Sequence, residues 1–348
     1  MRSAPELEPL VDPERLAAYL RTRMPGLEGA EIEVERHVAG HSNETYLVRS
    51  GQHEFVLRRP PRGAFLPTAH DVAREFRVLS ALAGTGVRAP RALLLCEDAD
   101  VIGAPFYLME RIPGTVIRDR LPEALDDLSA KSRIGEELVD ALVELHGVDW
   151  RAAGLEGFGK PSGYLERQVR RWKGQLELTE PLTRHVAELH VAGEWLEAHI
   201  PSSGEPTIVH GDYKLDNVVF DLRERPRLSA LLDWEMSTIG DPLADVGWML
   251  SFWRESGDPA EFVMDEQTVT RQPGFASRQE LIDRYAERSG RPVHDLPFYL
   301  VLAVWKLAIL LEGSYARHLA GMTDDPFFAH MEEGVPALAR RAVALTGS

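Results

Sequence analysis

The spacing of apolar residues changes at Pro113-Gly114, and this change constrains the possible folds of the chain more than any other feature. Before it, β-branched and aromatic residues alternate with polar ones in short runs, which predict strands at 31–38, 45–49, 54–58, 92–95 and 105–109. Helical spacing occurs there at 13–24 and 68–83. After it, helical spacing dominates, at 127–147, 164–178, 183–199, 278–289 and 297–320.

These patterns predict an α+β protein with two lobes. We expect an N-terminal helical extension at 1–26, a lobe at 27–111 with a five-stranded antiparallel sheet and a helix, and a larger, mostly helical lobe at 112–348. A chain of 348 residues also exceeds what one hydrophobic core usually serves. One β-rich stretch, at 207–233, interrupts the second lobe. Its three short apolar runs predict one small sheet, with the polar residues of the connecting loops at one end of it.

Charge and composition exclude several classes of function. The chain has 39 Lys and Arg against 55 Asp and Glu, a net charge of −16, which argues against nucleic acid or an acidic membrane as the partner. A single cysteine, Cys96, excludes an intrachain disulfide and fits a reducing compartment. The N-terminus has no secretory pattern, and the apolar stretch 296–311 is interrupted by Lys306 and is too short to span a bilayer. We therefore expect a cytoplasmic protein, whose oligomeric state the sequence leaves open.

The most informative segment is His210-Gly-Asp212-Tyr-Lys-Leu-Asp-Asn217, followed after the next apolar runs by Asp233-Trp-Glu235. Taken singly, Asp and Asn are ordinary turn residues. Here three oxygen-bearing side chains fall at neighbouring strand ends, where we expect them to converge. Oxygen ligands suit Mg²⁺, and phosphoryl transfer requires a positioned nucleophile and neutralised phosphate charge. The pattern therefore predicts a magnesium-dependent phosphoryl-transfer site.

These motifs resemble those of the aminoglycoside phosphotransferase and choline kinase superfamily, which has a protein-kinase-like fold. The resemblance implies that Asp212 accepts the proton of the substrate hydroxyl and that Asn217 and Asp233 bind Mg²⁺ on ATP or another nucleoside triphosphate. It also implies a bracing role for His210. Asp245, in the segment 240–247, resembles the residue that accepts backbone N–H bonds from the catalytic loop.

Glu235 lies two residues after Asp233 in an extended segment, so it would add a carboxylate to the metal site or order a metal-bound water. A kinase-like site also needs a cation on the third strand and a carboxylate on the following helix. Arg58 and Glu75 occupy these positions, although by resemblance the cation is usually lysine. Arginine is a planar fork that binds phosphate oxygens in pairs, so the exchange changes the detail of the phosphate contacts. The other expected nucleotide contacts are Ser42, Asn43, Glu110 and Ile112.

Longer stretches, at 56–63, 102–110, 167–172 and 233–246, resemble the kinase-like domain fused to acyl-CoA dehydrogenases in eukaryotes and its free-standing bacterial relatives. This resemblance implies that the acceptor is the hydroxyl of a hydroxyacyl-CoA, and in this group arginine at the position of Arg58 is usual. Four cations lie at helical spacing and form either a face for CoA phosphates or a solvated helix face: Arg167, Arg170, Arg171 and Lys173.

Other interpretations stay open. An aminoglycoside acceptor would need clustered acids, which the C-terminal helices offer without showing their geometry: Glu280, Asp283, Glu287, Glu312, Asp324 and Asp325. A non-catalytic kinase-like module would bind nucleotide but would not need Asp212. A metal-dependent hydrolase using His210 and Asp212 would need further histidines, and none accompanies them in a recognisable motif. Whichever holds, the expected substrate is a small molecule with a hydroxyl group.

Overall fold

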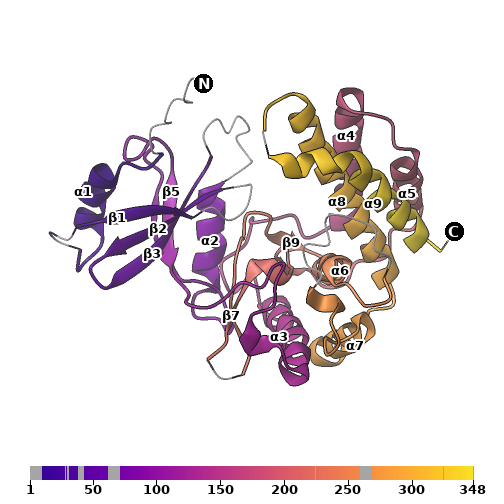
Figure 1. Cartoon of the computed structure of the whole chain (residues 1–348), viewed down its shortest axis with the longest axis horizontal. Coiled ribbons are helices and arrows are strands. Elements are labelled where there is room, and N and C mark those ends of the chain that lie inside the picture. Colours follow the sequence, from indigo (N-terminus) through magenta and orange to yellow (C-terminus); the bar gives the residue numbers. More distant parts are fainter. Residues whose placement is uncertain are drawn as a thin grey trace. The chain divides into compact units, whose positions relative to one another are not determined.

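The computed structural model describes residues 10–27, 29, 31–37, 43–61, 71–223, 225–258, 269–323 and 325–347. The chain divides into two compact units (Figure 1). Unit 1 comprises Met1–Thr85 and Ala89–Pro113, and unit 2 comprises Gly86–Arg88 and Gly114–Ser348. The chain therefore enters unit 2 briefly at Gly86–Arg88 before it completes unit 1.

Unit 1 is built on a five-stranded antiparallel sheet, as the sequence predicts. The strands follow the order β1-β2-β3-β5-β4 and comprise β1 (Glu33–His37), β2 (Glu44–Ser50), β3 (His53–Arg59), β4 (Ala92–Cys96) and β5 (Phe106–Glu110). Helices α1 (Pro13–Arg23) and α2 (Val72–Leu82) begin at Asp12 and Asp71, whose carboxylates accept N–H bonds from the first helical turn. The predicted helix at 68–83 is α2; its first predicted residues lie outside the described part of the chain.

Alternation along β3 determines which side chain faces which helix. Leu57 pairs with Tyr46 of β2, and both belong to the apolar cluster that contains Leu16 of α1. Arg58 is the next residue, so it points to the opposite face, the one on which Tyr107 pairs with it from β5. Helix α2 packs against β4 and β5 on that face, where Phe76 meets Tyr107 edge to face. The strand period therefore directs Arg58 toward the helix that carries Glu75.

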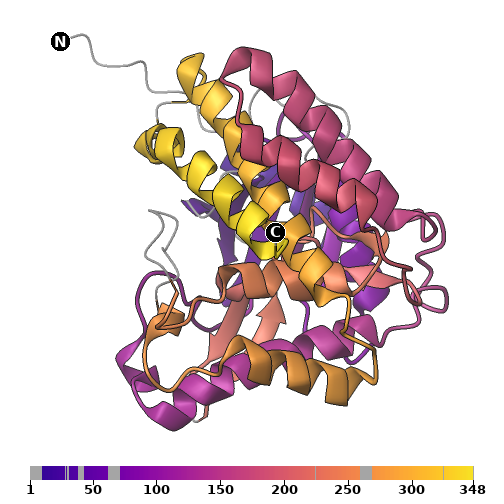
Figure 2. The ribbon, with the colours of Figure 1, turned by 90° about the vertical axis from the view of Figure 1, so that its right-hand side faces the viewer.

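Unit 2 is mostly helical, and its central element is α8 (Leu296–Leu319), which packs against four other helices. These partners are α4 (Tyr164–Thr179), α5 (Ala187–Ala198), α6 (Leu243–Phe252) and α9 (Met331–Leu345). Helix α7 (Arg278–Ser289) packs against α3 (Leu128–His146). Figure 2 shows α9 in yellow beside the orange-to-yellow ribbon of α8. The expected helices α3, α4, α5, α7 and α8 are confirmed, whereas α6 and α9 were not predicted.

The β-rich stretch of unit 2 forms two separate antiparallel pairs of strands, so the prediction of one small sheet is wrong. Strand β6 (Thr207–Val209) pairs with β9 (Thr238–Gly240), and β7 (Val218–Asp221) pairs with β8 (Arg227–Leu231). The physical reason is β9, an unpredicted three-residue strand that supplies the antiparallel backbone partner of β6. Strands β7 and β8 then pair with each other and satisfy each other's backbone hydrogen-bonding groups.

The apolar stretch of α8 continues into a 24-residue helix, so the expectation that it is too short to span a membrane is also wrong. Within the described part of the chain, it is the one helix whose length and composition would suit a membrane span. However, 67% of its most apolar window is buried inside the protein. Its apolar character is therefore that of a core helix surrounded by other helices.

We predict that Trp305→Ala lowers the free energy of unfolding by about 3–5 kcal/mol, because it removes a large side chain from the centre of α8. Trp305 is fully buried, and its indole N–H donates to the carbonyl of Leu189 in α5 at 2.8 Å. Leu319→Ala is the control on the same helix, since Leu319 is exposed; it should change stability by less than about 0.5 kcal/mol. Urea unfolding measures both, and similar losses in the two variants would contradict a core role for α8.

Candidate active site

The motif His210–Asn217 forms the loop between β6 and β7. Two side-chain hydrogen bonds and a glycine in a left-handed conformation hold this loop in place. Tyr213 is fully buried and donates its hydroxyl to the carbonyl of Leu138 at 2.7 Å. The Nε2 atom of His210 lies 2.8 Å from the carbonyl of Leu232, which fits the bracing role expected of this histidine. Gly211 has φ +86°, and a Cβ atom at this residue would lie 2.5 Å from the carbonyl oxygen of Met236, so only glycine fits there.

Asp245, in the first turn of α6, makes the backbone hydrogen bonds expected of it. Its carboxylate accepts the N–H of His210 at 2.6 Å and the N–H of Gly211 at 2.8 Å, and it lies 3.3 Å from Nε2 of His146. Burial by itself would raise the pKa of Asp245, but the bonds from His146 and Gly211 outweigh burial and hold that pKa below its ordinary value. The buried carboxylate is therefore ionised and fixes the start of the loop.

Trp248 orients Asp212 from the same helix, a role that the sequence did not predict. It lies three residues after Asp245, so both side chains project from one face of α6. Its indole N–H donates to Oδ1 of Asp212 at 2.8 Å. From the other side, Nδ2 of Asn217 donates to Oδ2 of Asp212 at 2.7 Å and to its carbonyl at 2.8 Å. Each carboxylate oxygen of Asp212 thus has a fixed donor.

Asn217 and Asp233 lie at the same end of the β7–β8 pair. These two polar residues therefore lie at a common strand end, as expected, although the strands do not form one sheet. Val218 pairs with Leu231, and the N–H of Leu232 donates to the carbonyl of Asn217 at 2.8 Å. Asp233 follows directly with φ +63°, a left-handed conformation that no other non-glycine residue adopts in the described ranges. Such strain costs about 1–3 kcal/mol and collects at functional sites.

These residues fit a magnesium ion by the chemistry of their donors. Asn217 commits its amide nitrogen to Asp212, which leaves its Oδ1 as the atom for a cation. Asp233 adds a carboxylate, and hard oxygen donors of this kind are what Mg²⁺ prefers. Glu235 lies partly buried in the turn between Asp233 and β9, so the expectation of an extended segment from Asp233 to Glu235 is wrong, because the left-handed backbone of Asp233 turns the chain there.

Lys214 is a second residue that the sequence analysis did not assign. Its Nζ lies 3.6 Å from Oδ2 of Asp212 and 3.5 Å from Oδ2 of Asp216. Burial would lower the pKa of Lys214, but the carboxylates of Asp212, Asp216 and Asp233 outweigh burial and raise it. The lysine therefore carries a positive charge among the acids of the loop. Burial also raises the pKa of Asp216.

Lys306 is a partly buried cation beside the same loop. It projects from α8, and its Nζ donates to the carbonyl of Gly211 at 3.0 Å. The ammonium also lies 4.0 Å from the ring centroid of Trp248 and 5.7 Å from that of Trp172. Burial lowers the pKa of Lys306 to about 8. In the sequence Lys306 is an isolated lysine in an apolar run. A single cation in such a run indicates that the side chain has a polar partner in the fold.

Unit 1 brings together the cation and carboxylate expected of a nucleotide site. Nη1 of Arg58 lies 3.2 Å from Oε2 of Glu75, and the Tyr107 hydroxyl donates to the same oxygen at 2.9 Å. The Nδ2 atom of Asn43 donates to the other oxygen, Oε1. All four side chains are buried. Tyr107 was not predicted; its register position opposite Arg58 would have indicated it. Ser42, the other predicted loop residue, lies outside the described residues.

The remaining predicted nucleotide contacts lie at the end of unit 1. Glu110 is the last residue of β5, and both its side chain and its backbone N–H bind Arg91, at 3.0 Å and 2.9 Å. Ile112 is partly buried just before Pro113.

The four cations of α4 have different surroundings. Arg167 donates to the carbonyls of Ser162 and Lys160. Lys173 forms an ion pair with Glu197 at 2.8 Å. Arg170 and Arg171 are exposed. Arg171 also lies 5.4 Å from the ring centroid of Trp172. Arg167 and Lys173 thus have oxygen partners within unit 2, which favours an ordinary helix surface over a phosphate-binding face for these two.

Comparison with known proteins now places the chain in a family. Residues 33–281 match the Phosphotransferase enzyme family, and the chain belongs to it. A sequence relative is mouse "Acyl-CoA dehydrogenase family member 10", which is 36% identical over 310 residues. That match covers 88% of this chain but 28% of the relative, so the chain spans less than a third of the mouse protein. The resemblances noted in the sequence are confirmed.

Solved structures support the same fold. A putative aminoglycoside phosphotransferase from Ralstonia eutropha JMP134 has a TM-score of 0.81 and 31% identity, and the match covers 97% of this chain and 98% of that one. The GDP complex of aminoglycoside 2'-phosphotransferase-IIIa has a TM-score of 0.64 and 18% identity, covering 96% and 99%. The second likeness shows the fold alone. The predicted α+β, kinase-like fold class is therefore confirmed.

We predict that Asp245→Asn destabilises unit 2 by about 1–3 kcal/mol, because an amide nitrogen would face a backbone N–H that now donates to a carboxylate oxygen. Thermal or urea unfolding measures this loss. Asp283→Asn on α7 is the matched control, since Asp283 is exposed and its partner is the neighbouring Gln279. If both variants unfold at the wild-type midpoint, Asp245 does not hold the loop.

Proposed function

We propose that the protein is an ATP- and Mg²⁺-dependent phosphotransferase that moves the γ-phosphoryl group to a hydroxyl of a small molecule. The observation that carries this proposal is the carboxylate of Asp212, whose two oxygens each accept a hydrogen bond from a fixed donor, Trp248 or Asn217. A module that only bound nucleotide would gain nothing from orienting this carboxylate. Membership of a phosphotransferase family supports the same reaction class.

In the proposed reaction, Asp212 accepts the proton of the acceptor hydroxyl while the new O–P bond forms and the bond from phosphorus to the β-phosphate oxygen breaks. The donors Trp248 and Asn217 direct the free lone pairs of Asp212 toward one position, which lowers the entropy lost in reaching the reactive geometry. Lys214 stays protonated beside Asp212, so it offsets the charge that several acids would otherwise concentrate there.

Asn217 and Asp233 would hold the magnesium ion. When bound, the ion neutralises charge on the phosphate oxygens. Arg58 is the proposed phosphate-binding cation of unit 1, and Glu75 holds its guanidinium in place. The related fold of aminoglycoside 2'-phosphotransferase-IIIa was solved as a GDP complex, which supports a nucleoside phosphate as the ligand of this chain without choosing between ATP and GTP.

A hydroxyacyl-CoA is the acceptor that we favour over an aminoglycoside. The mouse relative carries the name of an acyl-CoA dehydrogenase family member, which supports an acyl-CoA ligand. Lys306 supports it independently, because the positive charge of this partly buried lysine beside the Asp212 loop disfavours a polycationic acceptor. Two acids that an aminoglycoside site would use serve elsewhere: Glu280 caps α7, and buried Glu312 pairs with Arg184 at 3.2 Å. We also propose that the reaction is cytoplasmic and involves neither nucleic acid nor membrane.

We predict that Asp212→Asn binds ATP normally but loses about 10²- to 10⁴-fold in kcat, because the amide cannot accept the hydroxyl proton. Isothermal titration with Mg-ATP and steady-state phosphate transfer measure the two properties. Arg58→Ala should show the opposite pattern, a raised KM for ATP with a smaller change in kcat. Asp221→Asn, at the far end of β7, is the control and should match wild type. Unchanged turnover in Asp212→Asn would contradict the assignment.

A screen of acceptors tests the substrate class. With ATP and Mg²⁺, we expect hydroxyacyl-CoAs to stimulate ADP formation, while aminoglycosides, choline and sugars leave it at the background rate. Lys306→Met should raise KM for the acceptor by about 10- to 100-fold and leave KM for ATP unchanged. The reason is that it removes the ammonium group that lies against the Asp212 loop, where the acceptor hydroxyl is proposed to bind. Lys173→Met is the control, since Lys173 already pairs with Glu197. ATP hydrolysis that no acceptor stimulates would instead favour the non-catalytic module, and stimulation by aminoglycosides would contradict the acyl-CoA proposal.

A further inference from the structure

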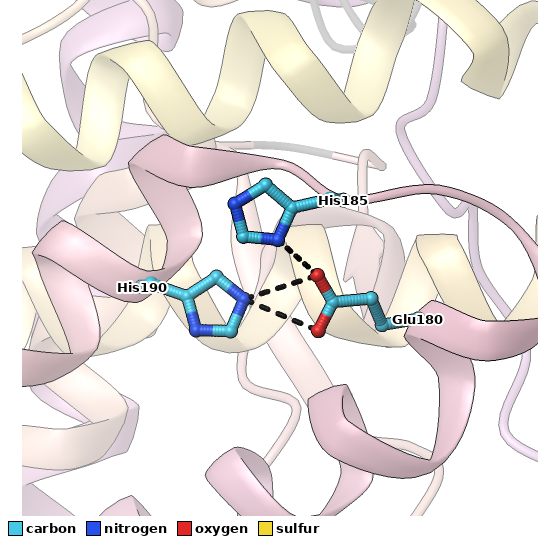
Figure 3. A group of neighbouring side chains, drawn as sticks. All are labelled: Glu180, His185 and His190. Carbon is cyan, nitrogen blue, oxygen red and sulfur yellow. Dashed lines mark hydrogen bonds and ion pairs between the residues drawn. The ribbon is translucent and has the colours of Figure 1, made fainter.

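Glu180, His185 and His190 bring their side chains together on the connection between α4 and α5 (Figure 3). Glu180 begins the short 3-10 turn Glu180–Leu182 that follows α4, His185 lies in the loop, and His190 lies in the first turns of α5. The Nδ1 atom of His185 contacts Oε1 of Glu180. The Nε2 atom of His190 lies 3.4 Å from Oε1 and 3.3 Å from Oε2 of the same carboxylate.

We propose that these three residues form a Zn²⁺ site that is separate from the candidate active site. Zinc binds imidazole nitrogen at about 2.0–2.1 Å and carboxylate oxygen at about 2.0–2.2 Å, with tetrahedral geometry. Neighbouring donor atoms in such a site therefore lie about 3.3–3.5 Å apart. The His190–Glu180 distances match this spacing, His185 lies closer to Glu180 in direct contact, and all three donor atoms lie within 4.8 Å of one another. A water would complete the fourth position.

The segment that carries the three ligands is held by its neighbours, so a metal would find it largely preorganised. Arg184, next to His185, donates to the carbonyl of Met331 at 2.8 Å and to Glu312 at 3.2 Å. Its guanidinium also lies 5.0 Å from the ring centroid of Tyr315. These contacts fix the backbone on the N-terminal side of His185. On the other side, the buried side chain of Leu189 fixes the turn that carries His190.

Both imidazole rings turn toward the same carboxylate. The rings are nearly parallel, with centroids 4.9 Å apart and an interplanar angle of 22°. Each ring directs one nitrogen at Glu180, so two nitrogens and a carboxylate lie around one position, as in a Zn²⁺ site. The side chains keep exposed fractions of 24%, 65% and 35% in chain order, so an ion can enter from solvent.

The site joins the end of α4 to the start of α5, and it uses none of the residues assigned to phosphoryl transfer. Its expected effect is therefore on the stability of this connection. Since a ligand that binds only the folded state stabilises it, Zn²⁺ should raise the unfolding temperature of the protein. This inference does not depend on the proposed function, and its test has a readout other than activity.

The experiment is a calorimetric titration of Zn²⁺ into the chelator-treated 348-residue chain, with saturating Mg²⁺ present to occupy oxygen-ligand sites. We expect one zinc ion per chain and a raised unfolding midpoint that EDTA reverses. Glu180→Gln and His190→Gln should each weaken binding by at least about tenfold, because each removes a ligand. His199→Gln is the control on the C-terminal side of α5, since its ring stacks on Trp195 and is not part of the trio.

Two results would overturn the proposal. Absence of saturable binding at micromolar Zn²⁺ would show that the trio is an ion-pair network only. Binding of equal strength in wild type and in both ligand variants would place the zinc elsewhere, for example at the Asp212 loop. The ligand positions are exposed or partly exposed, so both variants should fold, and circular dichroism checks this before the titration.

Discussion

The buried carboxylate of Asp245 is the interaction on which the candidate site depends. It accepts the N–H groups of two consecutive residues, His210 and Gly211, and so fixes the direction in which the loop leaves β6. Since unpaired buried N–H groups are costly, this pairing stabilises one loop conformation over others. Trp248, one helical turn later, then reaches Asp212 from the same helix. One short helix thus holds both the backbone of the loop and the orientation of the Asp212 carboxylate.

Charge balance is the second constraint on this site. Asp212, Asp216 and Asp233 would repel one another, and the nearby Lys214 reduces that repulsion. The ammonium of Lys306 donates to the carbonyl of Gly211 and lies over the ring of Trp248, which adds a second positive charge beside the loop. The loop is therefore not a simple acidic pocket. This mixture of signs is what separates the proposed acyl-CoA acceptor from a polycationic one.

Residue periodicity predicted much of the fold, and the failures have identifiable causes. Strand alternation placed Arg58 on the face where Glu75 lies, the helical period of α3 and α4 was visible in the sequence, and α8 was visible as a long apolar run. Helix α6 was missed because it is buried almost all round, so it shows no amphipathic stripe. Strand β9 has three residues, too few to show alternation. Trp248 was missed with its helix, and Tyr107 because its role depends on pairing between strands.

Local sequence determined which chemical groups are available and on which elements they lie: the carboxylate proposed as the base, two proposed oxygen ligands and a strand arginine can be identified as residue types at set spacings. The tertiary structure decided how those groups are held. The donors on Asp212, the ammonium of Lys306 under Gly211 and the trio of Glu180, His185 and His190 join residues whose meeting depends on how helices pack or how a loop turns. Spacing along one chain specifies a face of a helix or strand, but it does not specify what the next element presents to that face.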